Sequence, residues 1–432
     1  MNTLVLAILL LFGGRLAGAE PNVTFYRDVL GILQERCQGC HRPGEIGPMP
    51  LRSFNDVRPW AKAIKEAVIS RRMPPWYADR AVGDFHNNPS LSQKEIDTLA
   101  AWVDSGAAEG DSKDAPPPRV FVDGWNIGNP DLIVETPKAY EVPASGTIEY
   151  TYIIVPTGFH EDRWVSGAEL RPSNRAVVHH ASVFVRPPES TWLRQYPVGE
   201  FFVPQEQIRT ATTPRPVATT NAGAGQLNRS IAGYVPGRPE RTLPPGYAML
   251  VPAGSDLVFQ LHYTANGKGA TDQSRVGFVF AKTPTQKRVL SFSALEDRFV
   301  IPPGAAAYPV SGSGVLGVDA ELIEVYPHMH LRGKSMTLTA VYPTGTREEL
   351  LRVPKYDFNW QLLYQLSEPK RLPKGTLLTA DGVFDNSPNN RYNPNPGTEV
   401  RWGDQSWEEM MAGFFVVAVP ISTDPRTVFA PK

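Results

Sequence analysis

Two cysteines and a histidine form the most specific chemical motif in the sequence. Cys37 and Cys40 are the only cysteines, and His41 follows the second one directly, which gives the pattern C-x-x-C-H. This spacing allows two thiols to bond the vinyl groups of a c-type haem while the histidine ligates the iron. A zinc or redox pair is the alternative, but no other cysteine is present to complete a zinc site. We therefore expect a covalently bound haem c at Cys37, Cys40 and His41.

The sixth ligand of the haem iron should be a methionine or histidine from further along the chain. The candidates are Met49, Met73 and His86. Met73 lies in Arg-Met-Pro-Pro-Trp between two expected helices, where small class I cytochromes c have a Met-Pro loop. Met49 is only eight residues past His41, a short path around the porphyrin edge. We predict Met73 as the ligand, with Met49 or an open site as alternatives.

The remaining histidines are few and unevenly placed. The sequence has eight histidines, and those outside the haem region are His160, His179, His180, His262, His328 and His330. On a strand, His328 and His330 share one face, so both imidazoles can reach one metal ion. Neighbours on a regular strand point apart, so His179 and His180 need a bulge or a loop to converge. Each pattern alone is more often structural than metal-binding, whereas their combination favours metal sites.

Helix-forming patterns precede these β-type histidine motifs. Apolar residues recur at helical spacing after Thr24, from Val57 to Val68, and from Ser92 to Gly106. Ser92 and Glu95 have capping-box spacing. Residues 110–119 (GDSKDAPPPR) predict a semi-rigid linker. The segment from Pro21 to about residue 110 resembles a class I cytochrome c domain.

Beyond the linker the apolar period changes from about 3.6 to 2 residues. Strands are expected at 148–154, 257–262, 275–280, 322–326, 336–342 and 376–384. Many short strands punctuated by proline and glycine favour more than one β-sandwich or jelly roll. The predicted fold is multidomain: a small all-α cytochrome c domain followed by two all-β jelly-roll-like sandwich domains. The expected boundaries are 1–19 (signal peptide), 20–110 (haem domain), 111–121 (linker), 122–284 and 285–432 (sandwiches).

The N-terminus predicts export. Residues 4–12 are an apolar run that precedes Ala17-Gly18-Ala19, which matches the apolar region and cleavage pattern of a signal peptide. No basic residue precedes the run, so an uncleaved anchor is the alternative; no later stretch is long enough to span a membrane. We expect a periplasmic or secreted bacterial protein. A net charge of -1 gives no electrostatic reason to expect nucleic acid as a partner.

The order of the histidine motifs resembles that of the copper type II, ascorbate-dependent monooxygenases. This family includes the peptidylglycine alpha-hydroxylating and dopamine beta-monooxygenases. An adjacent histidine pair, a Leu-His-Tyr, a His-x-His and a late methionine occur here in the family's order, over about Gly124 to Val419. The resemblance implies two jelly-roll-like β-domains, each holding one copper, with a solvent cleft between them.

The resemblance also implies roles for individual residues. It assigns an electron-transfer copper to His179, His180 and His262, and a catalytic copper to His328, His330 and a thioether. The family's Asp-Glu-Met motif is matched by Glu408-Glu409-Met410, which makes Met410 the thioether ligand and Met411 the alternative. Imidazoles serve copper in both oxidation states, and a thioether stabilises Cu(I).

Three positions depart from the family's peptide-amidating members. Tyr326, Ala412 and Phe414 stand where those enzymes have the arginine, asparagine and tyrosine that hold a peptide substrate. Glycine-extended peptides are therefore not expected as substrates. A less polar substrate is expected instead.

Together these features predict an O2-dependent copper monooxygenase that hydroxylates a C–H bond of a small organic substrate. Electrons are expected to pass from the haem to the three-histidine copper and then to the methionine-containing copper. An ascorbate-like reductant or a respiratory redox protein would supply them. The alternative is a non-catalytic periplasmic electron-transfer or copper-binding protein, which the three substituted anchors favour. A haem protein with a carbohydrate-binding sandwich would leave the histidine pattern unexplained.

Overall fold

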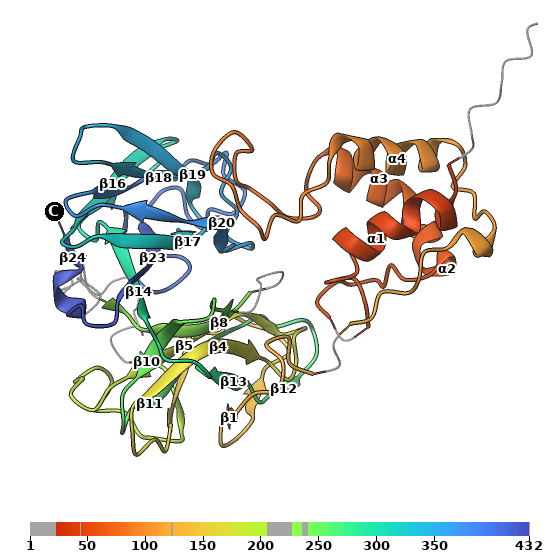
Figure 1. The fold of residues 1–432 in the computed structure, drawn as a ribbon. Coiled ribbons are helices and arrows are strands. Elements are labelled where there is room, and N and C mark those ends of the chain that lie inside the picture. Colours follow the sequence, from red (N-terminus) through yellow and green to blue (C-terminus); the bar gives the residue numbers. More distant parts are fainter. Residues whose placement is uncertain (1–22, 44, 122–123, 205–226, 236–240, 432) are drawn as a thin grey trace, which may run out of the picture.

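The computed structural model describes residues 23–43, 45–121, 124–204, 227–235 and 241–431. The predicted signal peptide (1–19) lies outside these residues. Figure 1 shows a small helical body joined to two layered β-bodies, as the sequence predicted in outline. Among the described residues, no helix has both the length and the apolar character needed to cross a membrane.

The helical body forms where the apolar periodicity predicted helices. Its elements are a π-helical turn η1 (Phe25–Val29), α1 (Leu30–Arg36), α2 (Phe54–Val57), a 3-10 turn η2 (Arg58–Trp60), α3 (Ala61–Ile69), α4 (Gln93–Asp104) and a second 3-10 turn η3 (Ser112–Asp114). Buried Leu33, Leu99 and Trp102 lie in its core. The predicted Ser92–Glu95 capping box is present. Thr24 makes no side-chain cap; instead the Asp28 carboxylate accepts from the Thr24 backbone N–H at 2.7 Å.

One long sheet runs through both β-bodies. Its order is β1 (Leu132–Glu135), β13 (Arg275–Phe280), β4 (Arg163–Arg171), β10 (Tyr247–Val251), β14 (Lys287–Leu295), β23 (Ala412–Pro420), β17 (Ala320–His328) and β20 (Tyr364–Leu372). Short strands β7 (Leu227–Asn228) and β9 (Arg241–Thr242) pair beside this path. The halves join where β10 and β14 pair in parallel. The expected domain break near 282–286 falls between β13 and β14, so the break in sequence is bridged by sheet hydrogen bonds.

Each half of the long sheet packs on a smaller five-stranded sheet. The N-terminal sandwich adds β6 (Phe201–Phe202), β3 (Thr151–Pro156), β11 (Asp256–Tyr263), β5 (Val178–Arg186) and β8 (Ser230–Tyr234). The C-terminal sandwich adds β19 (Arg347–Val353), β18 (Gly333–Val341), β21 (Leu377–Phe384), β16 (Tyr308–Leu316) and β24 (Phe429–Pro431), the last preceded by the 3-10 turn η5 (Pro425–Thr427). The pairs β2 (Tyr140–Val142) with β12 (Ala270–Asp272) and β15 (Val300–Ile301) with β22 (Val400–Arg401) form separate ribbons. Apolar side chains from both sheets fill each sandwich, which is the usual way two such layers exclude water.

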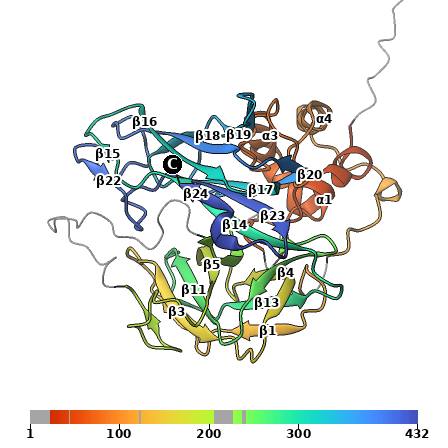
Figure 2. The same cartoon turned by 60° about the vertical axis from the view of Figure 1, so that its left-hand side comes forward.

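The segment between α3 and α4 leaves the helical body and lies along the edge strand β20 (Figures 1 and 2). Trp76 and Phe85 pack against Tyr364, with ring centroids 4.8 and 5.4 Å from it. Asn87 donates to the Leu363 carbonyl at 2.8 Å and accepts from the Gln365 backbone N–H at 3.0 Å. The helical body is thereby fixed to the C-terminal sandwich.

Candidate metal centres

A β-bulge brings the adjacent histidines together. Strands β5 and β11 pair so that His180 is opposite His262, and the next pair joins Val178 to Tyr263. His179 is thus the extra residue of a bulge. The distortion that the adjacent pair requires is present, and it turns both side chains toward His262.

These three imidazoles form a compact set of nitrogen donors, hereafter the three-histidine set. One ring nitrogen from each of His179, His180 and His262 lies within 4.8 Å of the others. Burial lowers the pKa of His262 to about 3 and holds the pKa of His180 well below its usual range. The buried Nδ1 of His262 has no hydrogen-bond partner. Neutral imidazoles gathered in this way fit a metal ion, because metal ligands must be deprotonated.

Neighbouring side chains orient this set. The ring of Tyr150 stacks on His262 with centroids 4.6 Å apart and an interplanar angle of 16°. Burial lowers the pKa of His179, and the nearby side chain of Asn359, from the segment between β19 and β20, opposes this lowering. Both sandwiches therefore contribute to the surroundings of the three-histidine set.

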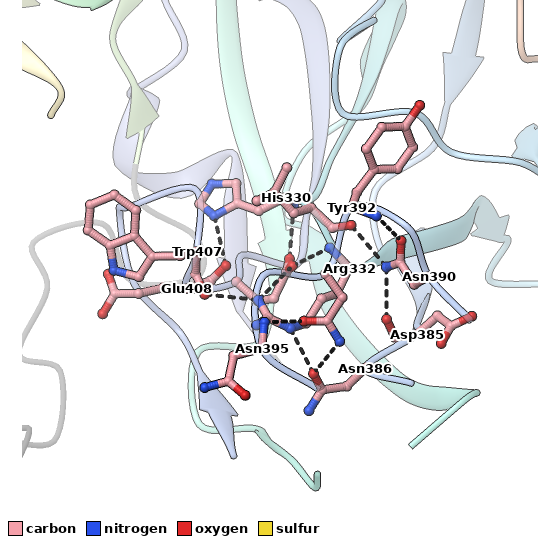
Figure 3. A network of polar contacts seen from close by, with 12 residues as sticks. His330, Arg332, Asp385, Asn386, Asn390, Tyr392, Asn395, Trp407 and Glu408 are labelled. Carbon is pink, nitrogen blue, oxygen red and sulfur yellow. Dashed lines mark hydrogen bonds and ion pairs between the residues drawn. The ribbon is translucent and has the colours of Figure 1, made fainter. Parts of the chain in front are cut away.

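His328 and His330 form a second set, hereafter the HxH set, at the end of β17. Their ring centroids are 5.1 Å apart. Nδ1 of His328 lies 2.8 Å from Oε1 of Gln361. Nδ1 of His330 lies 3.4 Å from the carbonyl oxygen of Glu408 (Figure 3). Since these oxygens can only accept, the Nδ1 atoms carry the protons and the Nε2 atoms are left as ligands. Burial lowers the pKa of His328 to about 4 and that of His330 well below its usual value.

Glu409 fixes the backbone around the HxH set. Its fully buried carboxylate accepts from the backbone N–H of His330 at 2.9 Å and of Arg332 at 2.6 Å. Burial raises the pKa of this carboxyl to about 8. Arg332 in turn donates to Asn386 at 2.8 Å and to the Trp407 carbonyl at 2.9 Å (Figure 3). This network ties the end of β17 to the segment that precedes β23.

The two candidate methionines differ in their surroundings. Strand β23 pairs with β17 so that Ala412 is opposite His328. Met410 and Met411 directly precede β23, and continuing its alternation of side chains would put Met410 on the face of Ala412 and His328 and Met411 on the other face. Met411 is fully buried in the apolar core beside Gly382, where an added Cβ would lie 2.9 Å from the Met411 Cγ. This geometry favours Met410 as the thioether ligand, which remains a prediction.

The two histidine sets face each other across one aromatic ring. The ring centroid of Phe358 lies 5.6 Å from that of His179, 6.4 Å from His180 and 5.8 Å from His330. His180 and His330 are buried, with 9% and 1% of their surface exposed. One aromatic side chain therefore contacts histidines of both sets.

The haem motif lies at the end of α1. Nδ1 of His41 lies 3.1 Å from the Met49 carbonyl oxygen, which leaves Nε2 available for iron. Gly47 packs on this ring so closely that an added Cβ would be 2.7 Å from the His41 Nδ1. Burial raises the pKa of the Cys37 thiol to about 12. Two thiols beside a histidine with a fixed tautomer fit covalent haem attachment.

The candidates for the sixth ligand are placed differently. The Met49 backbone lies on the Nδ1 side of His41, away from the nitrogen that would bind iron. The backbone N–H of His86 donates to the Gln365 carbonyl at 3.1 Å, and its ring nitrogen lies 3.2 Å from the Leu366 carbonyl, on the edge of β20. Half-buried Met73 follows α3 and stays the predicted ligand. His160 is exposed and has no assigned role.

The haem-attachment segment also contacts the N-terminal sandwich. Glu45 forms ion pairs with Arg42, at 2.8 Å, and with Arg175. Arg175 lies four residues before His179. Tyr234, which pairs with Ala181 beside His180, lies close enough to Cys40 and Glu45 for their ionisation to affect its pKa. The segment that carries Cys40 and His41 therefore lies against the strands of the three-histidine set.

Comparisons with known proteins identify no relative. No known family and no curated protein matches the chain. The chain is weakly similar to solved structures of infectious bursal disease virus. For the Gt strain the identity is 9% over 70% of this chain and 74% of that chain, with a TM-score of 0.19. For the Gx strain the identity is 11% over 70% and 76%, with a TM-score of 0.19. Such TM-scores do not establish a shared fold.

Proposed function

We propose that this protein is an exported oxidoreductase that contains haem c and two copper ions and uses O2 to hydroxylate a C–H bond of a small organic molecule. One observation carries the proposal. His179 and His180 converge with His262, more than 80 residues further along the chain, as an electron-transfer copper of the type II monooxygenase kind would require. The helical body would be the cytochrome c domain, and the sandwiches would be the two jelly-roll-like copper domains.

The three-histidine set has the donors for an electron-transfer copper. His179, His180 and His262 offer neutral imidazoles, which serve copper in both oxidation states. His328, His330 and Met410 would hold the catalytic copper, where a thioether stabilises the reduced ion. When bound, copper at such sites supplies one-electron redox chemistry and the activation of dioxygen.

The surrounding residues hold these nitrogen donors in a form that can bind a metal ion. Gln361 and the Glu408 carbonyl hold the Nδ1–H tautomers of the HxH set, so that both Nε2 atoms stay free. Tyr326 and Phe414 stack with centroids 5.4 Å apart and cover the region beside His328 with aromatic surface. This lining supports a substrate less polar than a peptide.

The haem would supply electrons to this centre. Cys37 and Cys40 would hold it covalently, with His41 and Met73 as iron ligands. The Glu45–Arg175 ion pair holds the haem-attachment segment against the strand that leads to His179. This contact supports delivery to the three-histidine set before the HxH set. An ascorbate-like reductant or a respiratory redox protein in the periplasm, or outside the cell, would reduce the haem.

Metal content tests the proposal. The full chain, exported in a host that matures haem c and then freed of loose metal, should hold about one iron and two copper ions. One iron without copper, even after reconstitution with Cu(I), would contradict the copper enzyme and leave a non-catalytic electron-transfer protein. Two coppers without oxygen uptake on any small apolar compound would indicate a copper-binding protein.

Rapid mixing tests the electron relay. The reduced protein is mixed with dioxygen and substrate, and the haem absorbance is followed together with product. Haem oxidation should keep pace with product formation. A haem that stays reduced while product forms would rule out the relay.

A further inference from the structure

Phe358 is a buried aromatic residue that does not belong to the apolar core. It is 8% exposed. None of the four apolar clusters among the described residues includes it. Its aromatic neighbours are instead the imidazoles of His179, His180 and His330. The ring contacts of Phe358 are therefore with the histidine sets.

A tight turn presents the ring. Residues 354–363, between β19 and β20, contain no helix or strand. The Asp357 carbonyl accepts from the Trp360 N–H at 2.9 Å, and the Asp357 carboxylate accepts from the Asn359 N–H at 3.0 Å. Phe358 is thus the second residue of a four-residue turn. These hydrogen bonds are made by its neighbours and do not involve the Phe358 side chain.

The same segment contacts both histidine sets. Asn359 lies near His179, and Gln361 accepts from His328 at 2.8 Å. The two residues that follow Phe358 at positions 359 and 361 therefore hold this segment against one histidine of each set, and the Phe358 ring itself contacts both sets. The imidazoles of His180 and His330 meet it at interplanar angles of 90° and 76°. Edge-to-face contact of this kind is the arrangement in which aromatic rings attract each other.

We propose that Phe358 occupies the substrate position between the two histidine sets, and that a neutral molecule with a small aromatic or similarly shaped apolar body binds by displacing it. The inference rests on the proposed function, since a C–H bond can react only beside the HxH set. The inference also specifies the class of substrate that this site would bind. The imidazoles would make edge contacts with the substrate ring, as they now do with Phe358. The stacked rings of Tyr326 and Phe414 would offer further aromatic surface.

The test observes the histidines directly and does not need copper. Haem-containing, copper-free protein labelled with 15N at its eight histidines is titrated with toluene. In Phe358→Ala, toluene should shift the ring signals of His179, His180 and His330 in a saturable manner. The wild type should need about tenfold more toluene, because displacing the phenyl ring lowers the binding-competent fraction. Signals of exposed His160 should not move.

Two further variants complete the test. Phe292→Ala, which removes an equally buried ring from the C-terminal core, should leave the three histidine signals insensitive to toluene. Phe358→Leu keeps apolar volume and should bind toluene with intermediate affinity, so it serves if the alanine variant does not fold. Unchanged histidine signals in both Phe358 variants, or equal toluene affinity in these variants and the wild type, would overturn the proposal. Failure of the proposed function would appear separately, as absence of copper in protein that still binds toluene.

Discussion

Removing the Glu409 carboxylate should damage one metal centre and spare the other. In Glu409→Ala, the backbone N–H groups of His330 and Arg332, now 2.9 and 2.6 Å from carboxylate oxygens, lose their buried acceptor. Each unsatisfied buried donor costs about 1–3 kcal/mol, so the variant should lose about 2–6 kcal/mol of unfolding free energy. Because His330 is then held less firmly, copper affinity at the HxH set should fall about 10–100-fold.

Two copper titrations and one unfolding curve check this prediction. Competition with a Cu(I) chelator should show one weakened site and one unchanged site in Glu409→Ala. Glu169→Ala is the matched control, because that buried carboxylate also accepts from two backbone N–H groups, of Asn126 and Ile127, but lies in the N-terminal sandwich. It should destabilise the protein to urea while both copper sites keep their affinity. Equal copper affinities in Glu409→Ala and wild type would refute the reasoning, and so would losses at both sites.

Three further predictions address other parts of the molecule. Arg175→Glu places a second negative charge beside Glu45 and should slow haem oxidation in the rapid-mixing assay. Adding Glu45→Arg to the same chain should restore the rate. An unchanged rate in both variants would show that the ion pair has no part in electron transfer. His262→Ala should reduce bound copper from about two ions to one, whereas His160→Ala, at an exposed histidine, should keep both. Hydrogen bonds from Lys287 and Tyr247 hold the pKa of Glu321 below its usual value. The ionised carboxylate therefore stabilises the folded state at pH values above the pKa that this group has in the unfolded chain. This stabilisation is lost as the pH falls through the lower pKa of the folded state. The urea midpoint of the wild type should therefore drop toward that of Glu321→Gln between about pH 5 and 3, and a constant difference between the two would contradict the assignment.

Periodicity and spacing predicted the parts of the fold that depend on local pattern. The strand expected at 275–280 is β13 with the same bounds, and the capping box at Ser92 begins α4 as predicted. The need for a bulge at His179 followed from the geometry of a strand, and the bulge is present. The continuity of the long sheet could not be foreseen, since the parallel pairing of Tyr247 with Lys287 joins strands that no local signal relates.

The surroundings of the candidate site were the least predictable part. Phe358, Asn359 and Gln361 lie in a stretch without helix or strand periodicity, and only the folded chain shows that they contact both histidine sets. The Glu45–Arg175 ion pair joins residues 130 positions apart, which no short motif can reveal. Glu409 was visible in the motif that contains Met410, but its hydrogen bonds to the HxH backbone were not.

The segment that lies along β20 has a consequence for the solubility of fragments. Phe85 forms a bridge with Leu366, His86 donates to Gln365 at 3.1 Å, and the Ser367 N–H donates to the Asp84 carbonyl at 2.9 Å, so this segment pairs with the first residues of β20 at the outer edge of the long sheet (Figure 1). A chain that begins after the linker would expose that edge together with Tyr364. Unprotected edge strands pair with one another, so the isolated sandwiches would self-associate. The segment between α3 and α4 therefore also acts as an intramolecular cap on this part of the sheet edge.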